Sequence, residues 1–557
     1  MIDYRGPVED IEYALQFGAD AQRLDNWDPE LCHEVVTQAA RFIDSEIAPL
    51  DQIADQQGAS ISDGRVVLPE SFVKAYNAYS ENGWPGLLAT EEEGGQEQPE
   101  VLGSVVSEML SGACLGLQTI LSLPQGAMRT IRMNGTEQQK SYYLPRLASG
   151  RWLATMCLTE PTAGSDLSQI KSKAVPDGGG WSITGTKIFI TGGDQNLSEN
   201  IVHLVLARTP EAPEGVRGLS LFICPAVTED GRRNNVEVLR IEEKMGLHVS
   251  PTCQMNFDGA QAEMLGSPGE GLRRMFTMMN ATRLDVGLEG LGVCEVAKQR
   301  SWSYARERLQ GRSPGATDPV EPLYRHGDVQ RMLLRQAALA QGSRALLYRT
   351  AVEMELPGQK PLVEFLTPVC KSFCTDAGFE AADLAVQIHG GYGFCKEYRV
   401  EQIVRDARIT RIYEGTNGIQ AMTLATRSLH VGNGACREAF ENWVKEAKGE
   451  ARDVGLDVSA DSVSQIFAHW QSTADIVAQS QDPGMVASDF MRLTGLLAFG
   501  VAWLYLERGL EQSPEPAKLA ALVQYVHTQV LPEAPTLASL VKAVSKTEPV
   551  DAALFAD

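Results

Sequence analysis

The sequence predicts an α+β multidomain protein: an N-terminal all-α domain, a middle antiparallel β barrel or sandwich, a C-terminal four-helix-type bundle and an additional C-terminal helical domain. Its 557 residues suggest three or four domains of about 150 residues each. The order of the domains follows from the sequence pattern. Helical periodicity comes first, short β-rich runs follow in the middle, and helical periodicity returns afterwards. The expected boundaries are residues 1–31 for an N-terminal extension, then 32–150, 151–264, 265–431 and 432–557.

The first domain is expected to be all-α because its apolar residues share one helix face. They recur at three- and four-residue steps from Val36 to Ile47, and Pro49 marks the end of that face. A second helix is expected near residues 100–121, where several small residues permit close packing against a neighbouring helix.

The middle domain is expected to consist of short strands with no helices between them, which is typical of an antiparallel sandwich or barrel. We interpret residues 181–184 and 187–190 as two strands joined by a tight turn at Gly185. Further strand-like runs lie at 201–207, 219–224, 236–241 and 253–257.

Helical patterns return after the middle domain. A Pro- and Gly-rich break lies at 311–322, and another helical region follows from about 463 to 544. Its most apolar stretch, 493–506, is shorter than the roughly 18 apolar residues of a spanning helix, so we expect no membrane span. A buried helix is favoured over a peripheral contact with a membrane surface. The bundle helices are expected near 286–309, 329–354 and 368–387.

Composition and missing motifs exclude several functions. The chain has 49 Lys and Arg against 72 Asp and Glu residues, a net charge of −23, so we expect no nucleic acid partner. Its ten cysteines are scattered without a CxxC pair, as expected in a reducing cytosol or organelle matrix, and the N-terminus shows no secretory signal. No P-loop, GxGxxG or HExxH motif occurs, and we expect no metal site.

Two motifs near the middle domain carry candidate chemistry. The turn from Met156 to Asp166 is rich in small and hydroxyl residues, whose exposed N–H groups suit carbonyls and phosphates, although a structural turn is equally compatible. Phe189 and Thr191 lie two positions apart and are expected to share a strand face, where they could contact a planar ring. A buried Phe beside a surface Thr is the alternative.

A third motif lies in the bundle and runs from Gln387, through a glycine-rich stretch, to RIYEGTNGIQ at residues 411–420. Its glycines permit close backbone approach, and Glu414 lies between an aromatic residue and a glycine. Apolar surroundings raise the pKa of a carboxyl group, which suits a general base for a weak carbon acid. An isolated glutamate in a helical domain is, however, more often on the surface.

In this order and spacing the motifs resemble the acyl-CoA dehydrogenase family. CLTEPTAGSD is similar to its flavin-loop signature, and RIYEGTNGIQ is similar to the motif that carries its catalytic glutamate. The N-terminal segment, the stretch KMGLHVSPTC and the C-terminal extension resemble an enlarged bacterial branch that includes 3-(methylthio)propanoyl-CoA dehydrogenases. The resemblance implies an FAD-dependent enzyme that converts an acyl-CoA substrate, either a methylthio or a fatty acyl thioester, to the trans-2-enoyl-CoA.

The same resemblance assigns roles to individual residues. Glu414 removes the α-proton while a hydride leaves the β-carbon for flavin N5. The substrate side comprises Ser165, Arg283 and Gly415. The residues expected to contact FAD are Met156, Leu158, Thr159, Ser165, Phe189, Thr191, Arg308, Gln387, Gly390, Gly391, Thr416 and Asn417. Among them, the set Arg308, Gln387, Gly390 and Gly391 is expected to reach the cofactor across a dimer interface.

Three positions depart from the family pattern. Phe189 stands where many relatives have tryptophan, which keeps a flat apolar cover but removes an N–H donor. The segment after Arg308 lacks a common aromatic residue and is one residue shorter. Gly418 replaces a frequent glutamine, which removes one expected FAD contact.

The resemblance further implies a cytoplasmic homodimer that passes its electrons to electron-transfer flavoprotein. Two alternatives stay open: an acyl-CoA oxidase that reduces O2, and a flavin-bearing DNA-associated protein of the same superfamily. A non-catalytic assembly factor is a third. The acidic composition argues against the DNA-associated protein, and the retained Glu414 argues against both this reading and the assembly factor.

Overall fold

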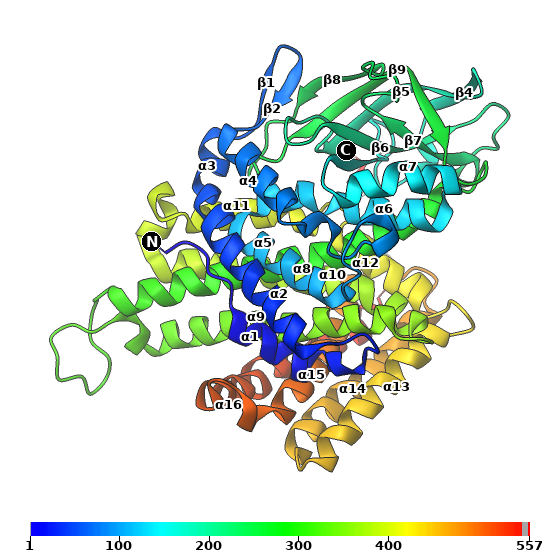
Figure 1. The fold of residues 1–557 in the computed structure, drawn as a ribbon. Helices are drawn as coiled ribbons and strands as arrows, with labels where there is room; N and C mark the ends of the chain where they lie inside the picture. The colour runs from blue at the N-terminus through cyan, green and yellow to red at the C-terminus, as the bar shows by residue number, and fades with distance from the viewer. Residues whose placement is uncertain (1, 548–554, 557) are drawn as a thin grey trace.

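The computed structural model describes residues 2–547 and 555–556, so the last part of the predicted C-terminal domain lies partly outside the described residues. The β-rich middle domain lies on one side of a helical body, and the last helices of the chain cover the opposite side (Figure 1). This arrangement confirms the predicted α+β architecture with its helical, β and helical parts.

The N-terminal part is largely helical. Asp28 caps its first long helix, because its carboxylate accepts hydrogen bonds from the backbone N–H groups of Glu30 and Leu31. Pro49, which was expected to mark the end of the apolar face from Val36 to Ile47, lies in the 3-10 turn between that stretch and the next helix, where proline is tolerated. The helices are α1 (Val8–Tyr13), α2 (Pro29–Phe42), α3 (Asp51–Gln57), α4 (Glu70–Glu81), α5 (Glu100–Leu121), α6 (Leu123–Asn134) and α7 (Glu137–Ala148).

One hairpin interrupts this domain, which was expected to be all-α. It pairs β1 (Ser60–Ser62) with β2 (Arg65–Val67). The turn residues Asp63 and Gly64 have φ values of +50° and +72°, and an Asp-Gly pair is a strong signal for such a two-residue turn. The guanidinium of Arg65 pairs with the buried carboxylate of Asp194 at 2.7 Å, which ties the hairpin to the middle domain.

The middle domain is a closed barrel. Its strands follow the order β3-β6-β4-β5-β9-β7, and β7 pairs back with β6 to close the ring, while β8 pairs with β9. The pairs are antiparallel except that β3 and β4 run parallel to β6. The strands are β3 (Trp152–Cys157), β4 (Lys173–Asp177), β5 (Gly180–Thr191), β6 (Asn200–Arg208), β7 (Leu219–Pro225), β8 (Val236–Ile241) and β9 (Thr252–Met264).

The β5 strand corrects one prediction. The sequence predicted two strands around a turn at Gly185, but the chain continues through Gly185 with φ +151° and shifts register against β9. A Cβ at this glycine would lie 2.2 Å from Ser172 Oγ. The glycine therefore permits a close approach between neighbouring strands, and no turn is made.

The bundle is organised by a close crossing of two helices. A Cβ on Gly290 would lie 2.3 Å from the carbonyl oxygen of Cys374, and a Cβ on Gly378 would lie 2.6 Å from that of Gly290. Because these glycines have no side chain, α8 and α10 touch through their backbones, which fixes their register. The helices are α8 (Gly271–Glu307), α9 (Gly327–Glu355), α10 (Lys360–His389), α11 (Val400–Ala407) and α12 (Asn417–Thr423).

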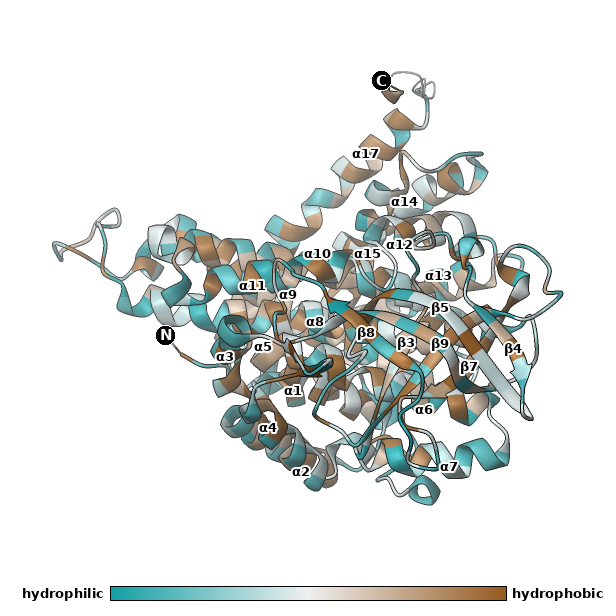
Figure 2. Cartoon of the chain, turned by 90° about the horizontal axis from the view of Figure 1, so that it is seen from above, coloured by the Kyte–Doolittle hydropathy of each residue, from teal (hydrophilic) through white to brown (hydrophobic). Residues whose placement is uncertain are grey.

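The C-terminal region adds a second helical layer. By length and composition α5 and α15 could each cross a membrane, but 89% of the apolar window of each is buried inside the fold. Figure 2 agrees with this placement, since the apolar segments concentrate in the central helices and the outer helices carry polar faces. The added helices are α13 (Ala435–Asp453), α14 (Asp457–Gln479), α15 (Ala487–Arg508), α16 (Pro516–Tyr525) and α17 (Ala534–Val544).

The N-terminal segment is anchored to distant parts of the chain. The Tyr13 hydroxyl donates a 2.5 Å hydrogen bond to the carbonyl oxygen of Leu506 in α15. Asp10 pairs with Lys298 at 3.2 Å, and Lys298 also pairs with the buried Glu295 at 2.8 Å. A buried charge network of this kind is costly to break, because removing one member leaves another without a partner.

Candidate active site

Glu414 lies at the point where the chain turns from a 3-10 segment into α12. Its φ is +56°, a strained left-handed conformation for a residue with a side chain, and Gly415 follows at +85°. Burial raises the pKa of the Glu414 carboxyl to about 7, while the cations of Arg283 and Lys371 act to lower it. A half-buried carboxyl with a pKa near neutrality fits a general base.

Lys371 of α10 holds this loop in place. Its Nζ donates hydrogen bonds to the carbonyl oxygen of Gly415 at 2.9 Å and to Asn417 Oδ1 at 2.8 Å. The Gln420 amide donates to the carbonyl oxygen of Glu414 at 3.0 Å. Lys371 is 0% exposed, and burial lowers its pKa to about 8. A buried cation from a neighbouring helix thus supports the strained conformation of Glu414.

Arg283 approaches Glu414 from α8. Its side chain is buried and donates from Nη1 to Asn280 Oδ1 at 3.3 Å, while Nε has no hydrogen-bond partner among the described residues. Burial lowers the pKa of Arg283, and the Glu414 charge opposes this shift. A guanidinium with donors to spare beside the carboxylate can bind a carbonyl or anionic group of a substrate.

Two further carboxyl groups lie one helical turn apart on α8, behind Glu414. Burial raises the pKa of Asp285 to about 7 and that of Glu289 to about 8, and the Glu414 charge adds to both shifts. The Tyr413 hydroxyl donates a hydrogen bond to Glu289. At pH 7 Glu289 is therefore mostly protonated, and the cluster carries less negative charge than its composition implies.

The first sequence motif lies at the end of β3, next to β5. The backbone N–H of Ile188 donates to the carbonyl oxygen of Thr159 at 2.9 Å. The fully buried Lys187 donates to the carbonyl oxygen of Leu158 at 3.0 Å and to Glu160 at 2.8 Å. Burial lowers the pKa of Lys187, and Glu160 counteracts this shift. The buried ion pair positions the loop that carries the predicted flavin contacts Leu158 and Thr159.

Phe189 lies at a bulge in β5, where the register against β9 shifts between Lys187 and Ile190. The bulge interrupts strict alternation, which corrects the expectation that Phe189 and Thr191 simply share a strand face. Phe189 has φ +58° and is 61% exposed, whereas Thr191 and Met156 are half-buried. A flat aromatic side chain exposed at this edge of the barrel fits a cover for a planar ring such as flavin.

Four predicted contacts lie together at the other end of the bundle. The guanidinium of Arg308 is 5.5 Å from the centre of the Tyr392 ring, which places it beside the glycine-rich stretch. Gln387 is exposed in the last turn of α10. A Cβ on Gly390 or Gly391 would meet nothing within 4 Å, so this backbone is open to a ligand.

One chain does not bring these four residues to Glu414. Arg283 and Arg308 are separated by 25 residues along α8 and its C-cap, which corresponds to about 37 Å at 1.5 Å per residue. The glycine-rich stretch therefore lies near the C-terminal end of α8, whereas Glu414 lies near its middle, where Tyr413 contacts Glu289.

The remaining predicted residues lie in the two loops. Ser165 is exposed in the turn after β3, and Gly415 is half-buried in the catalytic loop. Thr416 Oγ1 accepts a hydrogen bond from Ile419 N at 3.1 Å and caps α12. The Asn417 amide donates to Thr375 Oγ1 at 3.0 Å. Thr416 and Asn417 thus stabilise the loop that carries Glu414, and their contact with FAD stays a prediction.

Sequence reasoning missed Lys371, Lys187, Glu160 and Glu289. A signal was available for the two lysines, because each is a lone charge within an otherwise apolar run, PVCKSFC and TKIFI. A charged residue at a position that the pattern buries requires a partner. No such signal marks Glu289, whose role depends on a contact with Tyr413 124 residues away.

Comparison with known proteins agrees with this geometry. Family models for the acyl-CoA dehydrogenase N-terminal, middle and C-terminal domains match residues 30–151, 155–260 and 269–429. The chain therefore belongs to the acyl-CoA dehydrogenase family, which comprises flavin-dependent oxidoreductases that act on CH–CH bonds.

Particular relatives are similar over most of the chain. A 3-methylmercaptopropionyl-CoA dehydrogenase of Ruegeria pomeroyi is 39% identical over 546 residues, which covers 93% of this chain and 92% of that protein. A butyryl-CoA dehydrogenase of Syntrophomonas wolfei is 34% identical over 482 residues, which covers 80% of this chain and 78% of that protein. The solved structure of a Bacillus anthracis acyl-CoA dehydrogenase complexed with FAD is 22% identical in sequence and has a TM-score of 0.76. The match covers 96% of this chain and 91% of that chain. The predicted family and enzyme class are confirmed.

Replacing Lys371 tests its effect on the base. If Glu414 is the base, it must be ionised to act, so kcat/KM of the wild-type enzyme should fall about tenfold per pH unit below about pH 7. Lys371→Met removes a cation that lowers the Glu414 pKa, so its decline should begin at a higher pH. Lys371→Arg keeps the charge and should keep a profile closer to wild type. An unchanged profile in a Lys371→Met enzyme with full flavin content would contradict this role.

Proposed function

We propose that this enzyme uses FAD to dehydrogenate a 3-(methylthio)propanoyl-CoA or fatty acyl-CoA thioester to the trans-2-enoyl-CoA, with Glu414 as the base. The observation that carries the proposal is the half-buried Glu414 carboxyl, whose pKa of about 7 lets it exchange a proton at neutral pH. Two of the relatives are named as dehydrogenases of 3-methylmercaptopropionyl-CoA and of butyryl-CoA. Both names contain a short acyl group, which supports the proposed substrate class.

The chain's own groups prepare the substrate for proton loss. The α-hydrogen of a thioester becomes acidic only when its carbonyl oxygen is polarised. The backbone N–H of Glu414 donates to no acceptor in the described part of the chain, so it is free to bind that oxygen. Glu414 then takes the α-proton and becomes neutral as the C=C bond forms. FAD, when bound, accepts the hydride that leaves the β-carbon.

Glu414→Gln tests the base directly. The variant keeps the size and hydrogen-bonding capacity of the side chain but cannot take a proton. It should retain its yellow flavin and bind acyl-CoA, while flavin reduction slows by about 10³-fold or more. Stopped-flow absorbance after addition of an acyl-CoA measures this rate. Bleaching at the wild-type rate would show that another group is the base.

FAD binding by a homodimer is part of the proposal. The exposed Phe189 and the open backbone at Gly390 and Gly391 fit parts of a dinucleotide, but Phe189 belongs to the barrel, whereas the two glycines follow α10 in the bundle. A second copy of the chain, with its Arg308 and its glycine-rich stretch beside the barrel of the first copy, would complete the site. The Arg308 guanidinium suits a pyrophosphate in such an arrangement.

A mass measurement tests the dimer. Light scattering should give about twice the chain mass of 60.6 kDa. Arg308→Ala should weaken FAD retention even though this residue lies about 37 Å along α8 from Arg283 in its own chain. A tetramer mass, or full FAD retention by the variant, would contradict the proposed assembly.

Electron-transfer flavoprotein is the proposed electron acceptor, and O2 is the alternative that would make the enzyme an oxidase. The resemblance to the dehydrogenase branch supports the flavoprotein. With electron-transfer flavoprotein present in air, the rate of hydrogen peroxide formation should therefore be far lower than the rate of substrate consumption. A peroxide assay alongside enoyl-CoA formation distinguishes the two, and stoichiometric peroxide would favour the oxidase.

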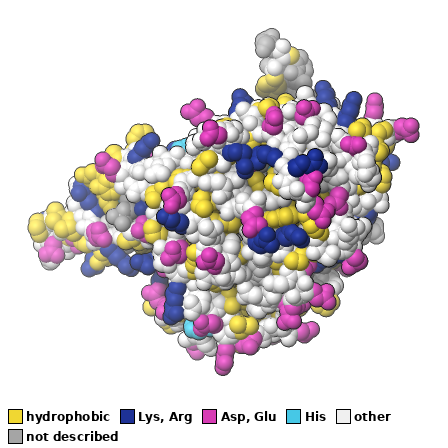
Figure 3. Space-filling model, turned by 45° about the horizontal axis from the view of Figure 1, so that its top comes forward, with side chains coloured by type: hydrophobic (Ala, Val, Ile, Leu, Met, Phe, Trp, Pro, Cys, Tyr) yellow, Lys and Arg dark blue, Asp and Glu magenta, His cyan; other side chains and the backbone are white. Residues whose placement is uncertain are grey.

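The DNA-associated alternative is not favoured. Basic and acidic side chains are interspersed over the face in Figure 3, and the net charge of −23 opposes contact with phosphates. We place the enzyme in the cytoplasm, a proposal supported by ten free cysteines, nine of them buried.

A further inference from the structure

The loop that carries Glu414 has two arms, and both arms reach one carboxylate. Arg411 ends the 3-10 segment that precedes Glu414, and Asn417 begins α12, which follows it. Asp376 of α10 receives both arms on a single oxygen atom, since its Oδ1 lies 2.6 Å from Arg411 Nε and 3.1 Å from Asn417 Nδ2. One side chain thus closes the loop 411–417, and Glu414 lies at the centre of this loop.

The side chain of Asn417 has one satisfactory orientation between these contacts. Its Oδ1 accepts a hydrogen bond from Lys371 Nζ at 2.8 Å, and its Nδ2 also donates to Thr375 Oγ1 at 3.0 Å. An amide flip would place its NH2 group against the ammonium and its oxygen against the carboxylate of Asp376. Lys371 and Asp376 therefore fix the C-terminal arm of the loop together.

The contact between Arg411 and Asp376 is partly open to solvent. Their side chains are 36% and 33% exposed, and the guanidinium of Arg411 lies 5.2 Å from the centre of the Phe379 ring. An ion pair with this exposure contributes little to the stability of a fold. We therefore expect the chain to fold without it, so that its effect on the loop can be measured separately.

Asp376 is itself held in place by the packing of α10 against the C-terminal helical layer. A Cβ on Gly495 of α15 would lie 2.5 Å from the Phe373 ring, and the rings of Phe373 and Phe499 are 5.2 Å apart. The same helix α15 also packs against α12, which begins at Asn417. The carboxylate and one arm of the loop thus share a common support.

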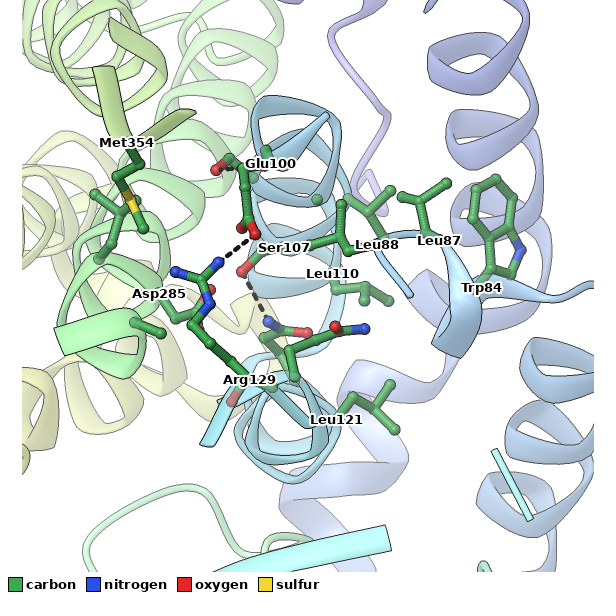
Figure 4. A pocket seen from close by; sticks show the side chains of 18 of the residues that line it. Trp84, Leu87, Leu88, Glu100, Ser107, Leu110, Leu121, Arg129, Asp285 and Met354 are labelled. Carbon is green, nitrogen blue, oxygen red and sulfur yellow. Dashed lines mark hydrogen bonds and ion pairs between the residues drawn. The ribbon is translucent and has the colours of Figure 1, made fainter. Parts of the chain in front are cut away.

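Asp376 and the pocket in Figure 4 belong to different parts of the site. Asp285 lines that pocket, which lies between α5, α6 and α8, and its carboxyl interacts with the charge of Glu414. Asp376 lines another space, between α9, α10 and α15, of about 480 Å³ including the part that is open to solvent. The two spaces share no lining residue among those that the structure describes.

We propose that Asp376 is a positioning residue: by fixing the distance between Arg411 and Asn417, it holds the carboxyl and the backbone N–H of Glu414 in the orientation that the reaction needs. This inference rests on the proposed dehydrogenase function with Glu414 as the base. The backbone of Glu414 is strained, at φ +56°, and relaxes if the ends of the loop move apart. Because Asp376 acts through the loop, it affects the rate of flavin reduction more than the affinity for acyl-CoA.

Two variants of Asp376 test this role with butanoyl-CoA. Asp376→Leu keeps a similar size but accepts from neither arm. It should slow flavin reduction about 10- to 100-fold, because a displacement of about 1 Å has an effect of this order. Asp376→Asn keeps an oxygen acceptor at the same place and should stay within about fivefold of the wild-type rate. Stopped-flow absorbance measures the rates, and calorimetry should give dissociation constants within about threefold of wild type for both variants.

Glu380→Gln is the matched control, one helical turn further along α10. Glu380 lines the same space as Asp376 and pairs with Arg335 at 2.7 Å, but it makes no hydrogen bond or ion pair with the loop 411–417 in the described part of the chain. Arg335 keeps a second partner in Glu533 at 2.9 Å. This variant removes a charge from the same helix and should keep the wild-type rate.

A double-mutant cycle tests whether Asp376 acts through Arg411. Arg411→Met removes one arm and should slow flavin reduction about threefold or more. When it is added to Asp376→Leu, the rate should fall little further, because the acceptor of that arm is already absent. Effects that multiply in the double variant would contradict a shared anchor.

The outcomes separate this inference from the function on which it rests. If no acyl-CoA reduces the flavin of the wild type, the proposed function fails and the inference fails with it. If the wild type reacts, the inference alone is overturned when Asp376→Leu keeps the wild-type rate, when Asp376→Asn is as slow as Asp376→Leu, or when affinity falls as much as the rate. If Asp376→Leu does not fold, a wild-type rate in Arg411→Met overturns the inference instead.

Discussion

The hydrogen bond from the buried ammonium of Lys371 to the carbonyl oxygen of Gly415 is the contact on which the site depends. It supports a left-handed backbone at Glu414 that a free loop would leave, and its charge opposes the effect of burial on the base. Lys371 lies on α10, which also meets α8 backbone to backbone at Gly290 and Gly378. A residue from the bundle thus influences both the conformation of Glu414 and the pKa of its carboxyl group.

Burial has different consequences for neighbouring carboxyl groups in this site. Glu289 is satisfied by the Tyr413 hydroxyl and is held mostly neutral, whereas Glu414 faces two cations and is half open. Asp285 lies between this cluster and the pocket beside α5. The same stretch of α8 therefore carries a group that contacts Tyr413, the neighbour of Glu414, and a group that lines the pocket.

Much of this could be predicted from the sequence, because periodicity and motifs are local signals. The barrel, the long helices and Glu414 followed from patterns within about ten residues of one another. The turn expected at Gly185 was wrong, since a glycine that serves a close contact looks the same in a sequence as a glycine that makes a turn. Lys371, Glu160 and Glu289 were missed because their partners come from other elements. The separation of Arg308 from Glu414 likewise depends on helix length, which the interrupted apolar pattern of α8 obscured.

The hydrogen bond between Tyr13 and Leu506 joins residues 493 positions apart. During synthesis, the segment around Tyr13 consequently leaves the ribosome well before its native partner, which does not exist until α15 has been made. Contacts of such high sequence separation slow folding and leave apolar surface uncovered in the nascent chain. This chain thus gains a fastened N-terminal segment at the expense of a longer interval in which the growing polypeptide exposes apolar surface.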